Sequence, residues 1–321
     1  MAYSVRTHFI SLWLMLSIAP ALAADIASSS VSLVSWNMQW LSLSGEFPES
    51  RRSDLDYQKM KSIFNTLSPD IFAFQEVDSI AVLKKVVPES EYRFYLSDRS
   101  KKASEFYPVS NQYTGFAVRS HLYVSDPSDL YQKNHIANNK PGKLRYGSYL
   151  IVQLDNGTQL HLLSVHLNSG CFSKNQRKQQ NSNKHCKQLK RQTNVLSDWI
   201  NKRQDKHQSF MIVGDFNHRL NHPNEWLLSY MNRRLKQPLV NLTAKTKGNC
   251  WARVRNAKGQ VQFRLYRSLI DHMLVSQDIA AKINDQESVY QLSFEQEDVK
   301  QYQLSDHCPI VAHLPLSPPS Y

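Results

Sequence analysis

Short apolar runs recur along the whole chain, and most are rich in β-branched or aromatic residues and end at turn residues. Runs of this length and composition predict β-strands. The polar segment Asp155-Asn156-Gly157-Thr158 lies between two of the runs and favours a hairpin there. The predicted strands are Val31–Trp36, Ile71–Phe74, Gly115–Arg119, Tyr149–Leu154, Leu160–Val165, Phe210–Val213, Leu269–Val275 and Ile310–Leu314.

Two longer segments show the helical period instead. Asp54–Leu67 places its apolar residues on one face, with Ser53 as a plausible N-cap and Pro69 just beyond the end. Cys186–Lys202 also has one apolar face, and lysines occupy its outer side. Strands joined by both helical crossovers and hairpins predict an α/β protein, with a mixed sheet or a pair of sheets and helices packed outside.

The first residues carry a targeting signal rather than part of the fold. Arg6 precedes the apolar stretch Phe9–Ile18, and Ala21-Leu22-Ala23 is a small-residue cleavage site. This is the pattern of a secretory signal peptide, although an uncleaved anchor is the alternative. The stretch is short for a membrane span, and no later one is apolar enough to cross a bilayer. We expect residues 1–23 to be removed and a secreted or periplasmic protein to begin near Ala24.

The rest of the chain, residues 24–321, is expected to form one domain. Its length suits one large domain or two small ones. No repeat and no long linker rich in Pro, Gly and Ser divides it, and the polar clusters described below are interleaved from end to end. One domain is therefore the simpler prediction, and we expect a monomer without stable membrane insertion.

Export changes how the four cysteines are interpreted, because an even number in an oxidising compartment suggests disulfides. Cys171 and Cys186 bracket one polar loop and are the favoured pair. Cys250 and Cys308 are the remainder, and a buried free thiol at Cys308 is an equal alternative. The spacings do not match a zinc site.

The chain is basic, with a formal net charge of +12, and the charge is unevenly distributed. Ser169–Ser197 contains seven Lys or Arg residues and no acid, and Trp226–Ile270 contains ten more, again with no acid. Such segregation suits a polyanionic partner, because basic side chains that contact phosphates release counterions. A solvated basic surface that aids solubility is the alternative.

Polar clusters follow several of the apolar runs, and they contain carboxylates, amides and imidazoles. These groups bind hard divalent cations, hold phosphates and move protons. Each cluster alone has an ordinary structural interpretation: a surface glutamate, a polar turn or a hydrogen-bonded core histidine. The clusters are Ser35-Trp36-Asn37, Phe74-Gln75-Glu76, Val165-His166-Leu167-Asn168, Gly214-Asp215-Phe216-Asn217, Ile270-Asp271-His272 and Ser305-Asp306-His307.

Taken in order, the clusters give Asn, Glu, His-x-Asn, Asp-x-Asn, Asp and Asp-His. This series resembles the endonuclease/exonuclease/phosphatase superfamily, which includes pancreatic-type deoxyribonucleases, abasic-site endonucleases, neutral sphingomyelinases and inositol-polyphosphate 5-phosphatases. The resemblance extends from about Ser32 to Leu314. It implies a four-layer α/β sandwich, with two mixed sheets flanked by helices and the active site at one edge. It also implies Glu76 as the principal ligand of Mg2+, or of Mn2+ or Ca2+, with Asn37 and Asp306 near the metal.

The same resemblance implies the catalytic roles. Asp215 and Asn217 would position water and phosphate. His307, oriented by Asp271, would be the base or would stabilise the transition state. His166 would be an acid or a phosphate ligand on the leaving-group side. Pancreatic-type enzymes support that histidine with a second glutamate, and this chain has no acid at the matching place.

The resemblance also identifies weaker candidates for contact with substrate phosphate. Tyr113 lies in Tyr113-Thr114-Gly115, which resembles a Tyr-Ser-Gly motif of abasic-site enzymes. The basic segment between Cys171 and Cys186 resembles an insert of exported bacterial members, and it would lie beside the cleft. The candidates are Asn168, Tyr113, Arg145, Lys174, Arg177 and Lys178.

These observations predict an exported, divalent-metal-dependent phosphodiesterase, most simply a nuclease that cleaves DNA with low sequence specificity. Low specificity follows because contacts to phosphate carry no base information. A lipid phosphodiesterase of the sphingomyelinase kind, or another phosphatase on the same fold, is the first alternative. A catalytically silent, toxin-like binding subunit is an alternative of another class.

Overall fold

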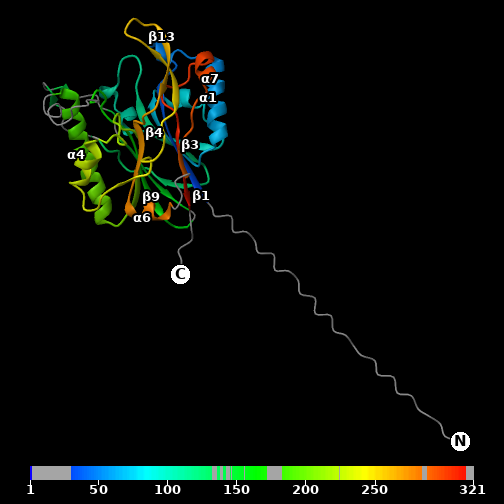
Figure 1. The fold of residues 1–321 in the computed structure, drawn as a ribbon, viewed down its shortest axis with the longest axis vertical. Helices are drawn as coiled ribbons and strands as arrows, with labels where there is room; N and C mark the ends of the chain where they lie inside the picture. The colour runs from blue at the N-terminus through cyan, green and yellow to red at the C-terminus, as the bar shows by residue number, and fades with distance from the viewer. Residues whose placement is uncertain are drawn as a thin grey trace.

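The computed structural model describes Met1 and residues 30–131, 136–137, 140–141, 145, 147–154, 156–171, 183–223, 225–283 and 288–315. Within this part, two six-stranded mixed sheets face each other (Figure 1). The strands are β1 (Ser30–Leu41), β2 (Ile71–Val77), β3 (Tyr92–Leu96), β4 (Tyr113–Arg119), β5 (Tyr123–Ser125), β6 (Ile136–Ala137), β7 (Lys140–Pro141), β8 (Ser148–Gln153), β9 (Gln159–His166), β10 (Ser209–Asp215), β11 (Val240–Asn241), β12 (Cys250–Arg255), β13 (Val261–Tyr266), β14 (Asp271–Val275), β15 (Val289–Gln291) and β16 (Ile310–Pro315). The α-helices are α1 (Asp54–Leu67), α2 (Ile80–Leu83), α4 (Lys184–Asp205), α5 (Leu227–Asn232), α6 (Gln277–Lys282) and α7 (Gln296–Gln301), and short 3-10 helices span Pro48–Ser50, Asp98–Lys101 and Ala103–Glu105.

Both sheets are built around a central pair of parallel strands. The first sheet has the order β15-β16-β1-β2-β4-β3, and β1 and β2 run parallel in it. The second has the order β11-β14-β10-β9-β8-β5, and β9 and β10 run parallel. The hairpin between β8 and β9 is the one predicted from the sequence. All eight predicted strands are present, although β1 continues as far as Leu41 and β14 begins only at Asp271.

Three apolar cores hold four layers together. The core between the sheets contains alternate side chains of their strands, such as Leu33, Ala73, Leu162 and Met211. Since side chains alternate along a strand, the other faces of the sheets must also be covered. A second core packs the first sheet against α1, and a third packs the other sheet against α4. Figure 1 shows α1 and α4 on opposite sides of the molecule. The predicted four-layer sandwich is therefore confirmed.

Local signals explain the two main helices. The Ser53 hydroxyl accepts a hydrogen bond from the backbone N–H of Asp56, and the Asp56 carboxylate accepts one from the backbone N–H of Ser53, which together form a capping box. The helix α1 has the predicted bounds, and Ser68 ends it in the left-handed conformation. The helix α4 begins two residues before the predicted start because Asn183 caps it.

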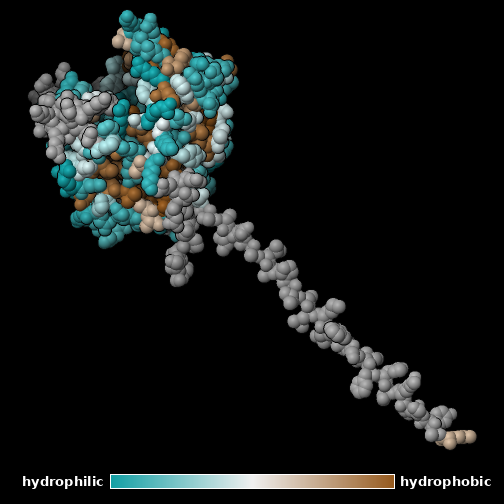
Figure 2. Space-filling model, viewed as in Figure 1, coloured by the Kyte–Doolittle hydropathy of each residue, from teal (hydrophilic) through white to brown (hydrophobic). Residues whose placement is uncertain are grey.

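The hairpin of β12 and β13 was not predicted from the sequence. It rises beyond the body of the molecule at the top of Figure 1. Both strands alternate apolar and polar residues with the period of a strand. Across the pair, however, Ala252 of β12 lies opposite Arg264 of β13 and Val254 lies opposite Gln262, so neither face of the hairpin is apolar throughout. The tip of this end is hydrophilic in Figure 2, and Phe263 and Tyr266 on β13 are 37% and 40% exposed. We call the segment from Cys250 to Tyr266 the ribbon.

Several sequence predictions concern residues outside the described part of the chain. These are the signal peptide with its cleavage site near Ala23, and the insert residues Lys174, Arg177 and Lys178. Among the residues that are described, no helix combines the length and apolar character needed to cross a bilayer.

Two disulfides are present in the described residues. Cys171 pairs with Cys186 as predicted, and this bond fixes the start of α4 to the segment that follows β9. Cys250 pairs with Cys308, so a free thiol at Cys308 is the wrong alternative. This second bond joins the base of the ribbon to the residue that follows His307. The sequence could not decide this pairing because the two cysteines are 58 residues apart.

Removing a disulfide should destabilise the protein in proportion to the loop that the bond closes. The bonds join residues 15 and 58 positions apart. Chain entropy then predicts losses of roughly 3 kcal/mol for the Cys171→Ala/Cys186→Ala variant and about 4 kcal/mol for Cys250→Ala/Cys308→Ala. Denaturant unfolding of both double variants beside the wild type measures these losses. An unfolding free energy unchanged by either double substitution would contradict the expectation.

Acid should destabilise the fold through the buried His161. Its Nδ1 lies 2.6 Å from the Tyr149 hydroxyl, and burial lowers the pKa of His161 to about 4. The unfolded imidazole titrates near 6.5, so between these values the unfolded chain binds more protons. This stabilisation is complete above pH 6.5 and is lost as the pH falls towards 4, by up to about 3 kcal/mol. The His161→Gln variant should lose less stability than the wild type over this range, whereas a variant of the exposed His207 should behave like the wild type.

Candidate active site

The topology brings the predicted residues to one end of the two sheets. Parallel neighbours end at the same edge, so Asn37 of β1 lies beside the end of β2, and His166 of β9 is paired with Asp215 of β10. Antiparallel neighbours begin where these strands end. The first residue of β14, Asp271, is therefore paired with Asp215, and the loop before β16 lies next to the end of β1.

Unusual backbone conformations redirect side chains at this edge. Glu76 has a φ of 60° and Asn217 a φ of 49°, both in the left-handed region that non-glycine residues rarely adopt. The register of β2 against both neighbours shifts beside Glu76. Gln75 can then reach Ser164 of the opposite sheet, at 2.9 Å, while Glu76 turns into the site. Strain of this kind is typical of functional sites, where the surrounding structure holds it in place.

Gly214 is required just before Asp215. Its φ is 129°, and a Cβ atom at this position would lie 2.2 Å from the carbonyl oxygen of Val165. Only glycine allows β10 to approach β9 this closely, at the point where Asp215 enters the site.

Three donors fix the carboxylate of Glu76. Its Oε2 accepts from the backbone N–H of Trp40 at 3.0 Å and from Nε2 of Gln112 at 2.6 Å. Its Oε1 accepts from Nδ2 of Asn37 at 3.2 Å. Oε1 therefore faces the centre of the site, while Oε2 is held by the protein.

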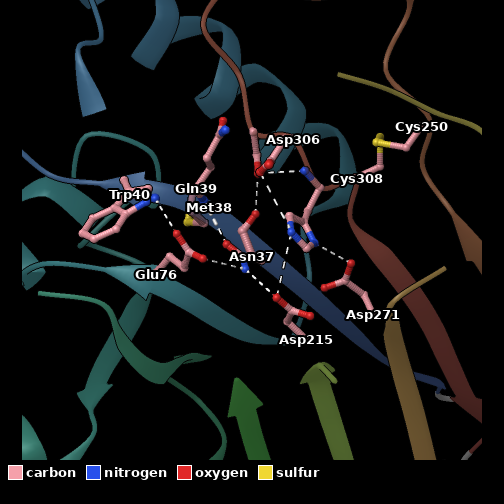
Figure 3. Close-up of polar contacts among 12 residues, drawn as sticks. Asn37, Met38, Gln39, Trp40, Glu76, Asp215, Cys250, Asp271, Asp306 and Cys308 are labelled. Carbon is pink, nitrogen blue, oxygen red and sulfur yellow. Dashed lines mark hydrogen bonds and ion pairs between the residues drawn. A yellow bond between two sulfur atoms is a disulfide. The ribbon is translucent and has the colours of Figure 1, made fainter. Parts of the chain in front are cut away.

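Asn37 connects the two sheets. Its Nδ2 also donates to Oδ2 of Asp215, at 3.0 Å, and Figure 3 shows Asn37 between Glu76 and Asp215. Asn217 donates to Asp215 from its backbone N–H at 2.7 Å and from Nδ2 at 3.1 Å. Burial raises the pKa of Asp215 to about 7; His307 lowers this pKa, and nearby Asp271 raises it. The left-handed conformation of Asn217 folds this residue back onto Asp215.

His307 is oriented by Asp271, as predicted. Nδ1 of His307 lies 2.6 Å from Oδ2 of Asp271, so Nε2 points into the site, 3.9 Å from both Asp215 and Asp306. Burial alone would lower the pKa of His307. The carboxylates of Asp271, Asp215 and Asp306 outweigh it and raise the pKa well above the usual value. This arrangement favours the protonated, positively charged form of His307.

His166 has the opposite electrostatics. Its Nε2 lies 3.4 Å from Asp215 and 3.5 Å from Glu76, but its buried Nδ1 has no hydrogen-bond partner in the described part of the chain. Burial lowers the pKa of His166 well below the usual value, and Arg145 and His307 lower it further. A neutral imidazole can still donate one hydrogen bond, so the arrangement suits a phosphate ligand better than a strong acid.

The remaining residues predicted to contact phosphate have fewer direct contacts with the centre of the site. Asn168 uses its side-chain N–H groups on the carbonyl oxygens of Ser169 and His185. Tyr113 is buried next to the guanidinium of Arg99. Arg145 donates to Oε1 of Gln112, the residue that holds Glu76, so it belongs to the outer part of the site.

Sequence reasoning missed three residues that support the site. Gln112 holds Glu76 through the hydrogen bond from its Nε2. Ser305 donates to the carbonyl oxygen of Asn37 at 2.6 Å and accepts from the backbone N–H of His307. Arg52 donates to backbone carbonyls on both sides of the site. An arginine just before a helix gives no signal of this role in the sequence.

The guanidinium of Arg52 joins the end of β1 to the loop that carries His307. Burial lowers the pKa of Arg52 to about 10, although nearby Tyr57, Asp56, Asp306 and Glu76 raise it. Its hydrogen-bond acceptors are the carbonyl oxygens of Met38, Gln39, Trp40, Gln303 and Leu304.

The carboxylates fit a hard divalent cation. Glu76 and Asp306 offer oxygen atoms, which are the ligands that Mg2+ prefers. Asn37 was expected near the metal, but it presents Nδ2 to Glu76 and Asp215, while its Oδ1 accepts from the backbone N–H of Gln39. Burial raises the pKa of Asp306, and Glu76 and Asp271 raise it further. A bound cation would offset this crowding of negative charge. Ligand atoms of Asp215, Asp271 and His307 also lie within 4.8 Å of one another, but His307 and Asp271 are already hydrogen-bonded together.

Comparisons with known proteins agree with this geometry. The sequence matches the model of the Endonuclease/Exonuclease/phosphatase family over residues 34–307. No curated protein matches the sequence.

Several solved structures are similar in fold. TDP2 from D. rerio, complexed with single strand DNA product, has 17% identity and a TM-score of 0.54, covering 89% of this chain and 98% of its own. An AP endonuclease from Archaeoglobus fulgidus has 14% identity and a TM-score of 0.53, covering 89% and 100%. The mannosyl-6-phosphatase Bt3783 from Bacteroides thetaiotaomicron has 14% identity and a TM-score of 0.54, covering 88% and 98%.

Such low identities establish the fold alone, whereas the family model spans most of the sequence and both sheets. The chain belongs to the endonuclease/exonuclease/phosphatase family.

Proposed function

We propose that this protein is an exported, divalent-metal-dependent phosphodiesterase, and that its substrate is nucleic acid, most simply DNA. The observation that carries the proposal is the convergence of Glu76, Asp215, Asp306 and the His307–Asp271 pair around Asn37. This set can hold a cation, place a phosphate and supply a positively charged donor next to it.

The charge of each residue determines the role that it has in hydrolysis. Asp215 and Asn217 hold the attacking water, and a carboxylate whose pKa is near 7 can accept a proton at neutral pH. The positively charged His307 donates from Nε2 to a phosphate oxygen as negative charge builds up there. The neutral His166 donates to another phosphate oxygen from the opposite side. A divalent cation at Glu76 and Asp306 would offset charge on the phosphate and on the leaving oxygen.

The positive charge of the protein supports a polyanionic substrate. The formal net charge is +12, and the ribbon carries Arg253, Arg255, Arg264 and the adjacent Arg267 at one end of the molecule. Among the similar structures, one is an endonuclease and another was solved with a DNA product. Lys174, Arg177 and Lys178 of the insert would add contacts to backbone phosphates. Since such contacts do not distinguish bases, we expect low sequence specificity.

We also propose that the protein is exported and is a monomer. Two disulfides among the described residues are compatible with an oxidising compartment, as is the signal-peptide pattern of residues 1–23. A lipid phosphodiesterase is the second candidate. It is supported by the exposed side chains of Val261, Phe263 and Tyr266, which a membrane surface could accept.

Cleavage of supercoiled plasmid tests the proposed activity. The purified mature protein should nick or linearise the plasmid with Mg2+ and should leave it intact with EDTA. His307→Ala and Asp271→Asn should slow cleavage by about 10²–10⁴-fold, because one removes the charged donor and the other weakens the partner that orients it. His313→Ala, which changes a histidine at the far end of β16, should cleave at the wild-type rate. Cleavage that persists in EDTA or in His307→Ala would refute the role assignment.

Glu76→Gln tests the proposed cation site separately. The substitution keeps the shape of the side chain and removes its charge. Loss of a supporting residue near a metal weakens binding by about 10–100-fold, so loss of a ligand charge should weaken Mg2+ binding at least as much. Titration calorimetry of Mg2+ and the Mg2+ concentration that gives half-maximal cleavage both measure the effect. The exposed Glu89→Gln is the matched control, and equal Mg2+ affinity in both variants would rule out Glu76 as the principal ligand.

A further inference from the structure

A cavity of about 510 Å³ lies next to the catalytic residues, between the base of the ribbon and the loop that carries His307. His307, Asp306 and Asp271 form its inner wall. The disulfide of Cys250 and Cys308 adds to its lining, and Figure 3 shows these two cysteines near Asp306. The cavity therefore opens directly from the position proposed for the scissile phosphate.

Two arginines on the cavity lining are not used by the fold. Arg219 follows β10 and Arg267 follows β13, and both side chains are exposed. Among the described residues, neither guanidinium is engaged in a hydrogen bond or an ion pair. Arg253 differs from them, because it donates to the carbonyl oxygen of Lys300 and packs over Phe263.

The rest of the cavity divides into an apolar and a polar part. Leu269 and the disulfide are buried, and they offer an apolar surface close to His307. Ser268 and Gln291 lie on the polar side together with the two arginines. An apolar floor beside a pair of unpaired guanidinium groups matches a sugar or base joined to a phosphate, because guanidinium groups bind phosphate in a bidentate way.

We propose that this cavity is a nucleotide subsite, in which Arg219 and Arg267 bind the phosphate one nucleotide away from the scissile bond. The proposal rests on the proposed function and deepens it, because it defines the substrate as a strand with at least two consecutive phosphates. The sugar between the two phosphates would lie against Leu269 and the disulfide. The subsite therefore favours a polynucleotide over a diester with a single phosphate.

The charge of the subsite also opposes a choline-bearing lipid. A choline headgroup carries a positive charge next to its phosphate, and two guanidinium groups would repel it. Recognition of quaternary ammonium groups uses aromatic side chains, and Tyr266 is the one aromatic residue on the described lining. The two guanidinium groups would instead attract the second phosphate of a nucleic acid, because opposite charges strengthen each hydrogen bond between them.

Neutralising single phosphates of a short single-stranded oligonucleotide tests this assignment. Methylphosphonate linkages, which carry no charge, replace one phosphate at a time, and kcat/KM is measured at each remaining bond. For the wild type, neutralising one of the two phosphates that flank the cleaved bond should lower kcat/KM by about tenfold to a hundredfold. In Arg219→Ala/Arg267→Ala, the same modification should change kcat/KM by less than about twofold, because the partners of that phosphate are gone.

The control is Arg233→Ala, which changes an exposed arginine directly after α5 that is not on the cavity lining. It should keep the full wild-type loss on neutralisation. Arg219→Gln/Arg267→Gln, with its thermal unfolding recorded, provides a second variant if the alanine variant is unstable. The subsite is overturned if neutralising the flanking phosphate lowers kcat/KM fully in either arginine-pair variant, or does not lower it in the wild type. A wild type that cleaves no oligonucleotide but hydrolyses sphingomyelin vesicles overturns the proposed function and the subsite with it.

Discussion

The structure depends most on how it holds several carboxylates together at one edge. Glu76, Asp215, Asp271 and Asp306 come from both sheets and from the loop before β16, and like charges this close repel one another strongly when they are partly buried. The protein offsets the repulsion with fixed donors. Asn37 bridges Glu76 and Asp215 without adding charge, and the carboxylates of Asp271, Asp215 and Asp306 favour the positively charged form of His307. Burial raises the pKa values of Asp215 and Asp306, and nearby carboxylates raise them further, so a bound cation would favour their charged forms.

Much of this arrangement follows from a topology that can be predicted from the sequence. Alternating apolar runs predict the strands, and polar residues directly after those runs predict the edge where they meet. The strand ends of Asn37, His166 and Asp215 could be inferred in this way, whereas the pairing of His307 with Asp271 was expected from the resemblance to the family. The fold class and the bounds of α1 follow from equally local signals, namely the capping box at Ser53 and the apolar face of the helix.

Other features depend on contacts that no local pattern encodes. Arg52 lies in a charged segment without a recognisable motif. Its role depends on the folded structure, in which it donates to carbonyl oxygens of β1 and of the loop before Ser305. The pairing of Cys250 with Cys308 depends on where the ribbon folds back, and each face of the ribbon mixes apolar residues of one strand with polar residues of the other. The left-handed conformations at Glu76 and Asn217 are equally invisible in the sequence, because neither residue is a glycine. They are imposed by the hydrogen bonds of the assembled site.

The disulfide and Arg52 hold the loop that carries His307 on both sides of that residue. Arg52 binds the carbonyl oxygens of Gln303 and Leu304 before the Asp306-His307 pair, and Cys308 is tied to the ribbon directly after it. Trp36 also donates to the carbonyl oxygen of His307 at 2.9 Å. Restraint on both sides leaves the imidazole little freedom except the orientation that Asp271 sets. The same bond places the base of the ribbon beside His307, so the element that holds the catalytic loop also shapes the cavity where the substrate strand would continue.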